Sequence, residues 1–380
     1  VSIPENDTTS YNYADFRMWV NDSTDTLRGI YWFMHPNNGD SRNIVTDSTY
    51  QALVSEQDFA LMGAHIFNMH MNTGIGDAVI AAMDSFAVLF RHDELEFIPF
   101  FVNGYSWGGQ FGYHFTKWIP ERVVGFITQK GGYHDTTDAG DAIEVPGLMF
   151  IGENDLPYRI ENLTGIFLEH RPLGAKWILA MEQGTGHTQV TDYSFLNSFF
   201  NTITNLRLPD SVDVFQPIQL NTLPDTLGWG GDQNSWIIGS FDCYDGLIDS
   251  SSWFPSKNVG ERWQYFVSEG EVNDTSECDG SVGIDIRIHV PTDFLLYHPY
   301  PNPFNPSTTL RFNIPSNTTK PVLINIYDIA GSVVKTVINE RIESGYHEIQ
   351  WNLTASSSGV YFVELRIGEK RLVQKLLFLK

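Results

Sequence analysis

The chain has little cysteine, little positive charge and no long apolar segment. Its two cysteines, Cys243 and Cys278, have no neighbouring pair of histidines, which excludes a structural zinc site built on them. No stretch approaches 18 consecutive apolar residues, so the sequence predicts no membrane span. The 23 basic side chains stand against 46 acidic ones, a net charge of −23. This balance argues against nucleic acid or an anionic membrane as the main partner, because both require a positive surface.

The length and composition of the chain indicate a folded protein of two or three domains. Hydrophobic residues make up 42% of the 380 residues and aromatic residues 14%, which excludes an acidic disordered tail. The charge divides the chain: residues 1–205 carry −15, residues 206–293 carry −11 and residues 294–380 carry +3. We expect a domain boundary near residue 293, because the sign of the net charge changes there.

Residues 1–205 alternate between strand-like and helix-like patterns. Apolar runs of strand length occur at residues 29–34, 59–66, 98–103, 123–128, 147–151 and 177–181. Helical periodicity occupies the intervals, roughly residues 46–57, 76–90, 108–118, 161–169 and 193–204. The pattern predicts an α/β fold, a mostly parallel sheet flanked by helices, with reaction chemistry at the carboxyl ends of the strands.

The remaining residues follow two other patterns. Residues 206–293 are rich in Asp, Ser, Gly and Trp, and we expect them to pack on the first domain, with a helix near residues 256–266; a flexible tether is the alternative. Residues 294–380 contain short alternating runs between Gly, Asn and Ser turns, which predict an all-β domain, an immunoglobulin-like sandwich.

A Gly-x-Ser-x-Gly motif follows the strand-like run at residues 98–103. It reads Gly104-Tyr105-Ser106-Trp107-Gly108, and a helical pattern begins directly after it. This context is typical of a nucleophile elbow, where small residues permit a sharp turn that lifts the serine hydroxyl above the sheet. The amide of Trp107 would face a developing oxyanion at the start of the helix.

An acid and a histidine follow the serine, each at the predicted carboxyl end of a strand. They are Asp155 and His187, with Glu153 as the competing acid. The ends of parallel strands meet at one edge of the sheet, so Ser106, Asp155 and His187 are able to converge there as nucleophile, acid and general base.

The loop after residues 29–34 is the expected source of a second oxyanion donor. Pro36 has no N–H, so the amide of Asn37 is the first choice and that of Asn38 the second. Tyr105, Trp32, Asn38 and His70 are candidates for contact with substrate, with a core or surface role as the alternative for each.

Residues 28–205 resemble the α/β-hydrolase superfamily, in particular feruloyl and acetyl esterases and polyhydroxyalkanoate-depolymerase-like esterases. The resemblance is carried by Met34-His35-Pro36-Asn37-Asn38-Gly39, Gly104-Tyr105-Ser106-Trp107-Gly108-Gly109, Gly152-Glu153-Asn154-Asp155 and Gly186-His187. It implies a serine esterase without a cofactor. The spacings of 49 residues from Ser106 to Asp155 and of 32 from Asp155 to His187 leave no room for a large lid domain.

Residues 294–380 resemble the type IX secretion sorting domain of bacteria. The resemblance is carried by Tyr300-Pro301-Asn302-Pro303-Phe304-Asn305-Pro306, Ile326-Tyr327-Asp328-Ile329-Ala330-Gly331 and Gly359-Val360-Tyr361-Phe362. It implies recognition by the secretion machinery and a secreted or cell-surface location. In that oxidising setting a disulfide between Cys243 and Cys278 is expected, with two free thiols as the alternative.

These observations lead to one expected function and several alternatives. The expected function is a secreted serine carboxylesterase acting through an acyl-enzyme, with feruloyl or acetyl esters of polysaccharides as substrates. A polyester hydrolase, a serine peptidase and a non-catalytic binding protein are the alternatives. No metal site, nucleotide cofactor or nucleic-acid partner is expected.

Overall fold

The computed structural model divides into two compact units, Val1–Ser281 and Val282–Lys380. It describes residues 1–36, 39–211, 213, 216–244, 246–270, 275–276, 295–296, 299, 304–314, 320–342, 345–353, 358–368 and 370–379. Within this described part of the chain, no helix combines the length and the apolar character needed to cross a membrane.

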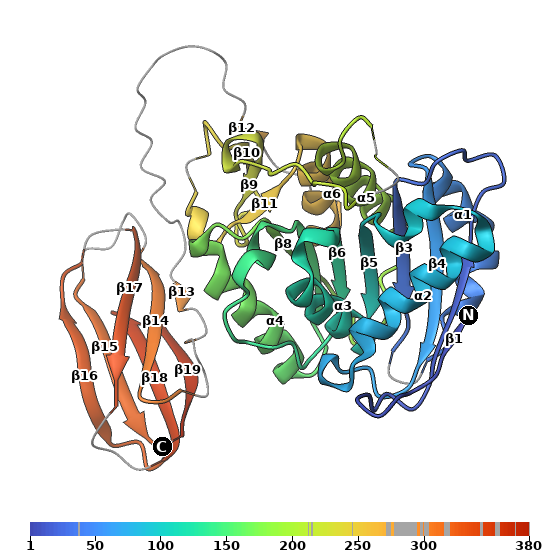
Figure 1. Ribbon diagram of the computed structural model, residues 1–380. Coiled ribbons are helices and arrows are strands. Elements are labelled where there is room, and N and C mark those ends of the chain that lie inside the picture. Colours follow the sequence, from blue (N-terminus) through green and yellow to red (C-terminus); the bar gives the residue numbers. More distant parts are fainter. Residues whose placement is uncertain are drawn as a thin grey trace. The chain divides into compact units, whose positions relative to one another are not determined.

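The first unit is built on an eight-stranded sheet with the order β1-β2-β4-β3-β5-β6-β7-β8 (Figure 1). The pairings from β4 through β3 to β8 are parallel, whereas β2 runs antiparallel to both β1 and β4. The strands are β1 (Ser2–Ile3), β2 (Ala14–Trp19), β3 (Gly29–Met34), β4 (Phe59–Ile66), β5 (Phe100–Tyr105), β6 (Val123–Gln129), β7 (Gly147–Gly152) and β8 (Trp177–Glu182).

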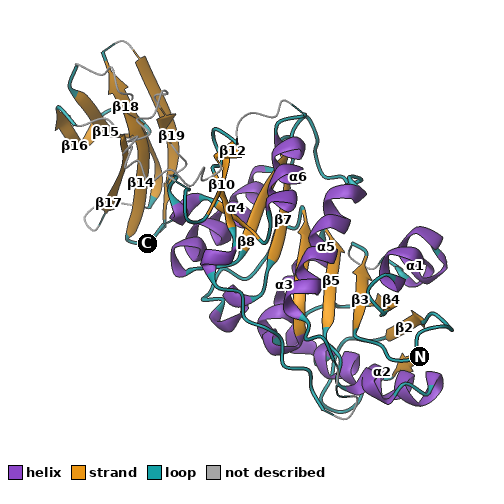
Figure 2. Ribbon diagram, turned by 90° about the horizontal axis from the view of Figure 1, so that it is seen from above, coloured by secondary structure: helices purple, strands orange, loops and turns teal. Residues whose placement is uncertain are grey.

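Helices cover both faces of this sheet (Figure 2). Adjacent residues of β3 show why: the Tyr31 ring packs edge-on against Tyr50 and Phe200, while the Trp32 ring meets Phe111 and Phe115 on the other face. Successive strand residues point to opposite faces, and both faces here are apolar. The helices are α1 (Ser48–Ser55), α2 (Ile75–Phe90), α3 (Trp107–Trp118), α4 (Pro157–His170), α5 (Tyr193–Arg207) and α6 (Lys257–Val267).

Short 3-10 helices complete several connections of the first unit. They are η1 (Arg42–Thr46), η2 (Met71–Thr73), η3 (Asp93–Glu96), η4 (Pro120–Arg122), η5 (Gly140–Glu144), η6 (Arg171–Leu173), η7 (Asp225–Leu227) and η8 (Ile248–Ser250).

The described residues between 206 and 281 share the core of the first unit. Trp253 and Trp263 are buried in the same hydrophobic cluster as the large sheet, and the Trp263 indole donates to the Leu179 carbonyl of β8 at 2.7 Å. Arg171 reaches across to the Ser251 carbonyl at 2.6 Å. A second small sheet, of order β11-β9-β10-β12, lies here, built from β9 (Trp229–Gly231), β10 (Ile238–Ser240), β11 (Ser252–Phe254) and β12 (Thr275–Ser276).

The second unit is all β. One sheet has the order β13-β14-β17 and the other β16-β15-β18-β19, all antiparallel. Apolar residues of both sheets, Leu310 and Phe312 in one and Ile324 and Val363 in the other, belong to one buried cluster. The strands are β13 (Leu295–Leu296), β14 (Ser307–Ile314), β15 (Val322–Asp328), β16 (Val333–Glu340), β17 (Gly345–Asn352), β18 (Gly359–Ile367) and β19 (Lys370–Phe378).

The expected fold class agrees with the structure at this level: an α/β domain with a mostly parallel sheet, followed by an all-β domain. Two strands of the first sheet were not predicted from the sequence, β1 (Ser2–Ile3) and the antiparallel β2 (Ala14–Trp19) beside β4. β1 has only two residues. The apolar residues of β2 alternate with charged ones over only six positions, and it has no crossover helix to mark it. The finer assignment to an immunoglobulin-like sandwich stays a prediction.

Candidate active site

Ser106 stands on a strained turn between β5 and α3. Its backbone has φ 56° and ψ −119°, a combination that a residue with a side chain rarely adopts. Two backbone hydrogen bonds hold the turn: the Ser106 amide donates to the Gln129 carbonyl at 2.7 Å, and the Gln110 amide donates to the Ser106 carbonyl at 3.1 Å. The strained conformation is therefore fixed by its neighbours in β6 and α3.

The glycines around Ser106 are required by close packing of the backbone. A Cβ on Gly104 would lie 2.3 Å from the Gly108 carbonyl carbon, and a Cβ on Gly108 would lie 2.5 Å from the His35 carbonyl oxygen. These atoms are backbone and cannot rotate away. The Gly-x-Ser-x-Gly pattern thus reflects the space at the turn as well as its dihedral angles.

Ser106, His187 and Asp155 form a hydrogen-bonded chain at the carboxyl edge of the sheet. His187 Nε2 lies 2.8 Å from Ser106 Oγ, and His187 Nδ1 lies 2.8 Å from Asp155 Oδ2. An ionised carboxylate only accepts hydrogen bonds, so Nδ1 carries the proton and Nε2 accepts from the serine hydroxyl. In this tautomer the imidazole is oriented to take the proton of Ser106.

Asp155 lies directly before α4 with its side chain only 2% exposed. Burial alone would raise the pKa of this carboxyl group, but hydrogen bonds from His187, from Arg159 and from the Leu156 amide outweigh burial and lower the pKa. Arg159 Nη1 donates to Oδ1 at 2.9 Å and the Leu156 amide at 2.7 Å. The carboxylate is therefore held ionised, with one oxygen reserved for His187.

Glu153, the competing acid, bonds elsewhere. Its Oε2 accepts from the Gly184 amide at 2.7 Å, whereas the histidine is bonded to Asp155. Glu153 thus ties the end of β7 to the loop after β8.

The loop that carries His187 is fixed to β5 and β6 on both sides of the histidine. The Tyr105 hydroxyl donates to the His187 carbonyl at 2.7 Å. Three residues later, the Val190 amide donates to Gln129 Oε1 at 3.0 Å, and Gln129 Nε2 donates to Asn103 Oδ1 at 2.8 Å. Gln129 therefore holds the serine turn through its backbone carbonyl and the histidine loop through its side chain.

Lys130, the next residue, holds the same loop with a buried positive charge. Its side chain has no exposed area, its φ is 53°, and its ammonium pairs with Glu182. It also donates to Thr185 Oγ1 at 3.0 Å and to Thr188 Oγ1 at 3.2 Å, one residue on from His187. A buried ammonium is stable only when its donors are satisfied, so this contact set fixes the loop strongly.

Of the predicted oxyanion donors, only Trp107 lies among the described residues. Trp107 is the first residue of α3, where the backbone amides of a helix point outward and favour negative charge. Asn37 and Asn38 lie outside the described residues. Of the residues on either side of them, the Gly39 amide donates to the Pro36 carbonyl at 2.7 Å.

The predicted substrate contacts need one correction. Trp32 is fully buried between Phe111 and Phe115, so the interpretation of Trp32 as a substrate-binding residue is wrong. All six residues of β3 are buried, because helices cover both of its faces. Tyr105 lies beside His187, with ring centroids 5.2 Å apart, and His70 packs edge-on against Trp107 at 5.1 Å.

The cysteine prediction lies partly outside the described residues. Cys243 is disulfide-bonded, whereas Cys278 is not among the residues that the structure describes. The pairing of the two stays a prediction. In the described ranges, no group of three or more His, Cys, Asp or Glu side chains could hold a metal ion.

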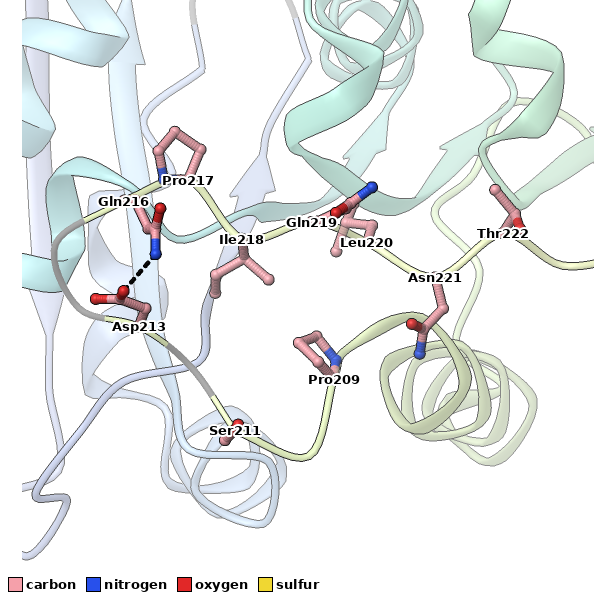
Figure 3. Close-up of a pocket in the computed structure, with 10 residues that line it drawn as sticks. All are labelled: Pro209, Ser211, Asp213, Gln216, Pro217, Ile218, Gln219, Leu220, Asn221 and Thr222. Carbon is pink, nitrogen blue, oxygen red and sulfur yellow. Dashed lines mark hydrogen bonds between the residues drawn. The ribbon is translucent and has the colours of Figure 1, made fainter.

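A hollow of about 600 Å³ lies along the segment after α5 (Figure 3). Its lining includes Pro209, Ile218 and Leu220. The Pro209 carbonyl accepts from Arg28, which directly precedes β3, so this hollow is at the amino end of the strands. The serine and histidine are at the opposite edge.

Three functional neighbours of the triad were not predicted from the sequence. Arg159 stands four residues after Asp155, a helical spacing that was available as a signal. For Lys130 the available signal was a charged residue at the end of an apolar strand, directly before two glycines. Gln129 gave no signal, because only the folded structure shows that its amide reaches the histidine loop.

Comparisons with known proteins give a family match for the second unit and structural neighbours for the first. Residues 298–379 match the secretion system C-terminal sorting domain. This match indicates an exported bacterial protein, secreted or held at the cell surface. Comparison with curated proteins gives no match.

The similar solved structures include esterases and hydrolases at low sequence identity. An S-formylglutathione hydrolase from Staphylococcus aureus is 12% identical, with a TM-score of 0.38, 54% of this chain covered and 96% of that chain. An acetyl xylan esterase from Aspergillus awamori is 14% identical, with a TM-score of 0.38, 53% of this chain covered and 98% of that chain. An S-formylglutathione hydrolase from Agrobacterium tumefaciens is 13% identical, with a TM-score of 0.39, 54% of this chain covered and 93% of that chain.

Proposed function

We propose that the protein is a secreted serine carboxylesterase in which Ser106, His187 and Asp155 form the catalytic triad. The observation that carries the proposal is the hydrogen-bonded chain from Ser106 Oγ through His187 to Asp155, with both distances 2.8 Å, on a strained turn at the start of a helix. A serine hydroxyl is a weak nucleophile unless a base takes its proton, and this arrangement supplies the base and orients it.

In the acylation step, Ser106 Oγ attacks the ester carbonyl carbon while His187 Nε2 takes the hydroxyl proton. Asp155 stabilises the imidazolium that results. The carbonyl oxygen becomes an anion, for which the Trp107 amide and the Asn37 amide are the proposed donors. Collapse of the tetrahedral intermediate breaks the bond to the alcohol oxygen, and His187 returns the proton to the departing alcohol.

Deacylation repeats these steps with water. His187 takes a proton from water, the hydroxide attacks the acyl carbon, and the bond to Ser106 breaks. The proton passes back to Ser106, so that the enzyme is regenerated and the carboxylic acid is released.

The proposed substrates are feruloyl or acetyl esters of polysaccharides, with a polyester as the alternative. Support comes from the short connections around the site: between Ser106 and His187 the chain forms only α3, α4 and short 3-10 helices besides the strands, with no inserted lid domain. The lack of a lid domain between Ser106 and His187 would suit an ester attached to a bulky chain. The sorting domain, through the secretion machinery, would bring the enzyme to polymers outside the cell.

Hydrolysis of short p-nitrophenyl esters by the wild type and by Ser106→Ala tests this proposal. We expect turnover by the wild type and a loss on the order of 10⁴-fold or more in the variant, because the nucleophile is gone. Equal rates for the two proteins, or no activity in a correctly folded wild type, would contradict the proposal. Methyl ferulate, acetylated xylan and a soluble polyester then distinguish the substrate classes.

A further inference from the structure

Two tyrosine rings lie in contact, tilted to each other, at the surface near the proposed triad. Tyr133 is 66% exposed and Tyr158 is 38% exposed. Their ring centroids are 5.2 Å apart, with an angle of 31° between the ring planes. Single exposed aromatic residues are common, but a pair of rings held together in water leaves a contiguous apolar face uncovered.

Each tyrosine is close in sequence to a residue that lies near a member of the proposed triad. Gly131, two residues before Tyr133, lies close to Ser106: an added Cβ there would be 3.1 Å from the Ser106 carbonyl oxygen. Tyr158 is followed by Arg159, which donates to Asp155 at 2.9 Å. The two rings therefore lie at the rim of the proposed catalytic centre rather than at a distant surface.

The position of the pair is fixed by further contacts. The Tyr133 amide donates to Gln110 Oε1 at 3.0 Å, one helical turn after Ser106. A Cβ on Gly132 would lie 2.8 Å from the Tyr158 ring and 2.5 Å from the Arg159 side chain, so the chain passes close beneath both residues. The Arg159 guanidinium lies 5.3 Å from the centre of the Tyr158 ring. These contacts hold the backbone at Tyr133 against α3 and place the Arg159 side chain beside the Tyr158 ring.

An exposed apolar side chain lies nearby in the sequence. Leu156, directly after Asp155 and two residues before Tyr158, is 51% exposed, and its amide is the one that binds the Asp155 carboxylate. A sugar ring would require several polar side chains around a stacking face, whereas an aryl ring requires mainly apolar and aromatic surface. Two exposed tyrosine rings in contact, with an exposed leucine close in sequence, fit the second requirement.

We propose that Tyr133, Tyr158 and Leu156 form an aryl-binding rim that selects esters carrying an aromatic ring. The inference rests on the proposed esterase function and narrows it to aryl esters. An aromatic group placed on the rim would bring its ester carbonyl to Ser106, and stacking would raise the apparent affinity for such esters over small aliphatic ones.

Selectivity between esters tests the rim. The measured quantity is the ratio of kcat/KM for methyl ferulate, and separately for phenyl acetate, to kcat/KM for methyl acetate. In Tyr133→Ala we expect at least one ratio to fall about tenfold. Tyr133→Phe keeps the aromatic face, and Tyr265→Ala removes an exposed tyrosine of α6, so both should retain the wild-type ratios. A change of less than threefold in both ratios for Tyr133→Ala overturns the proposal.

A binding measurement separates failure of the rim from failure of the esterase proposal. Saturation-transfer NMR with methyl ferulate and Ser106→Ala detects contact with the aryl protons without turnover. We expect transfer in Ser106→Ala and its loss on adding Tyr133→Ala. Equal transfer in both variants, or none in Ser106→Ala, overturns the rim. Hydrolysis of none of the three esters by the wild type instead overturns the esterase function.

Discussion

Buried polar side chains serve different purposes in the two units. In the first unit, Gln129 and Lys130 reach from the end of β6 to the loop that carries His187. In the second unit, the buried Asn325 and Glu364 connect adjacent strands: Asn325 accepts from Thr336 of β16 at 2.8 Å, and Glu364 accepts from the Tyr327 hydroxyl of β15 at 3.3 Å. Buried polar groups therefore hold a loop in place in one unit and hold a sheet together in the other.

The net charge also differs between the two parts of the chain that meet at residue 293, inside the second unit. Residues 1–293 carry 14 basic and 40 acidic side chains, which gives −26, whereas residues 294–380 carry +3. The excess of acid thus belongs to the part that holds the proposed triad. It favours solubility outside the cell and would repel an anionic polymer. The acidic net charge of the whole chain therefore comes from residues 1–293 alone.

The largest loss of activity is expected from a substitution of Asp155 in the first unit. In Asp155→Asn the neutral amide no longer stabilises the imidazolium and favours the wrong tautomer of His187, so we expect kcat to fall on the order of 10⁴-fold while the fold is retained. The check is kcat on a p-nitrophenyl ester, with circular dichroism to confirm folding. Activity within tenfold of the wild type would show that the carboxylate has no part in the reaction.

A smaller effect is expected when the buried lysine is replaced. Lys130→Met removes the ammonium that binds Thr185 and Thr188, so the loop that carries His187 can shift. We expect kcat to fall roughly 10–100-fold with KM changed by less than about threefold, since an ångström of misplacement costs about that much.

Glu364→Gln in the second unit is the matched control for this substitution. Glu364 is buried and paired with Arg371, and its loss should weaken only the β-sheet. We expect kcat to stay within about twofold of the wild type. If Lys130→Met left kcat unchanged, or if Glu364→Gln reduced it equally, the contrast between the two units would fail.

Removal of residues 294–380 should have little effect on the reaction. Each unit has its own hydrophobic core, so the first is expected to fold alone. We expect kcat/KM on a soluble ester to stay within about twofold of the full chain. A soluble, folded but inactive fragment would show that the second unit takes part in catalysis.

The smallest expected effect concerns one surface acid of the first unit. Burial raises the pKa of Asp135, but hydrogen bonds from Lys117 and Thr137 outweigh it and bring the pKa to about 2. A depressed pKa stabilises the folded state above the ordinary pKa of the group, and this contribution is lost as pH falls toward the folded value.

Urea unfolding of Asp135→Asn at several pH values is the measurement. We expect the variant to be less stable than the wild type by about 0.5–1 kcal/mol at pH 7, since solvent screens this pair, with the difference gone near pH 2. Asp138→Asn, another aspartate of the same loop, is the control. A difference that persists unchanged at pH 2 would contradict this origin.

The fold was largely predictable because the parallel strands of the large sheet, β3 to β8, are continuous apolar runs between breakers. Five helices of this unit were predicted with similar accuracy from their periodicity, α2 (Ile75–Phe90) within one residue. The order serine, acid, histidine along the chain was enough to predict the candidate triad, since parallel strands deliver their carboxyl ends to one edge. Local pattern and topology together were sufficient for these features.

Two kinds of feature could not be predicted from the sequence. One is whether a side chain on a strand is buried by helices, and the other is which residues far apart in the sequence come into contact. Trp32 was misjudged because its strand, β3, ends near the site, yet helices bury both of its faces. Nothing in the sequence shows that Gln129 meets Val190, 61 positions away, or that the Tyr133 ring contacts the Tyr158 ring. Such pairs become visible only once the strands are placed side by side.

The most direct test of the central claim is covalent labelling of the nucleophile. A fluorophosphonate reacts only with a serine whose hydroxyl is activated by a neighbouring base, and the modified peptide is identified by mass spectrometry. We predict a single adduct on Ser106 in the wild type, none in Ser106→Ala, and labelling slowed by orders of magnitude in His187→Gln. An unlabelled wild type, or an adduct on another residue with Ser106 unmodified, would contradict the assignment of Ser106 and His187 as nucleophile and base.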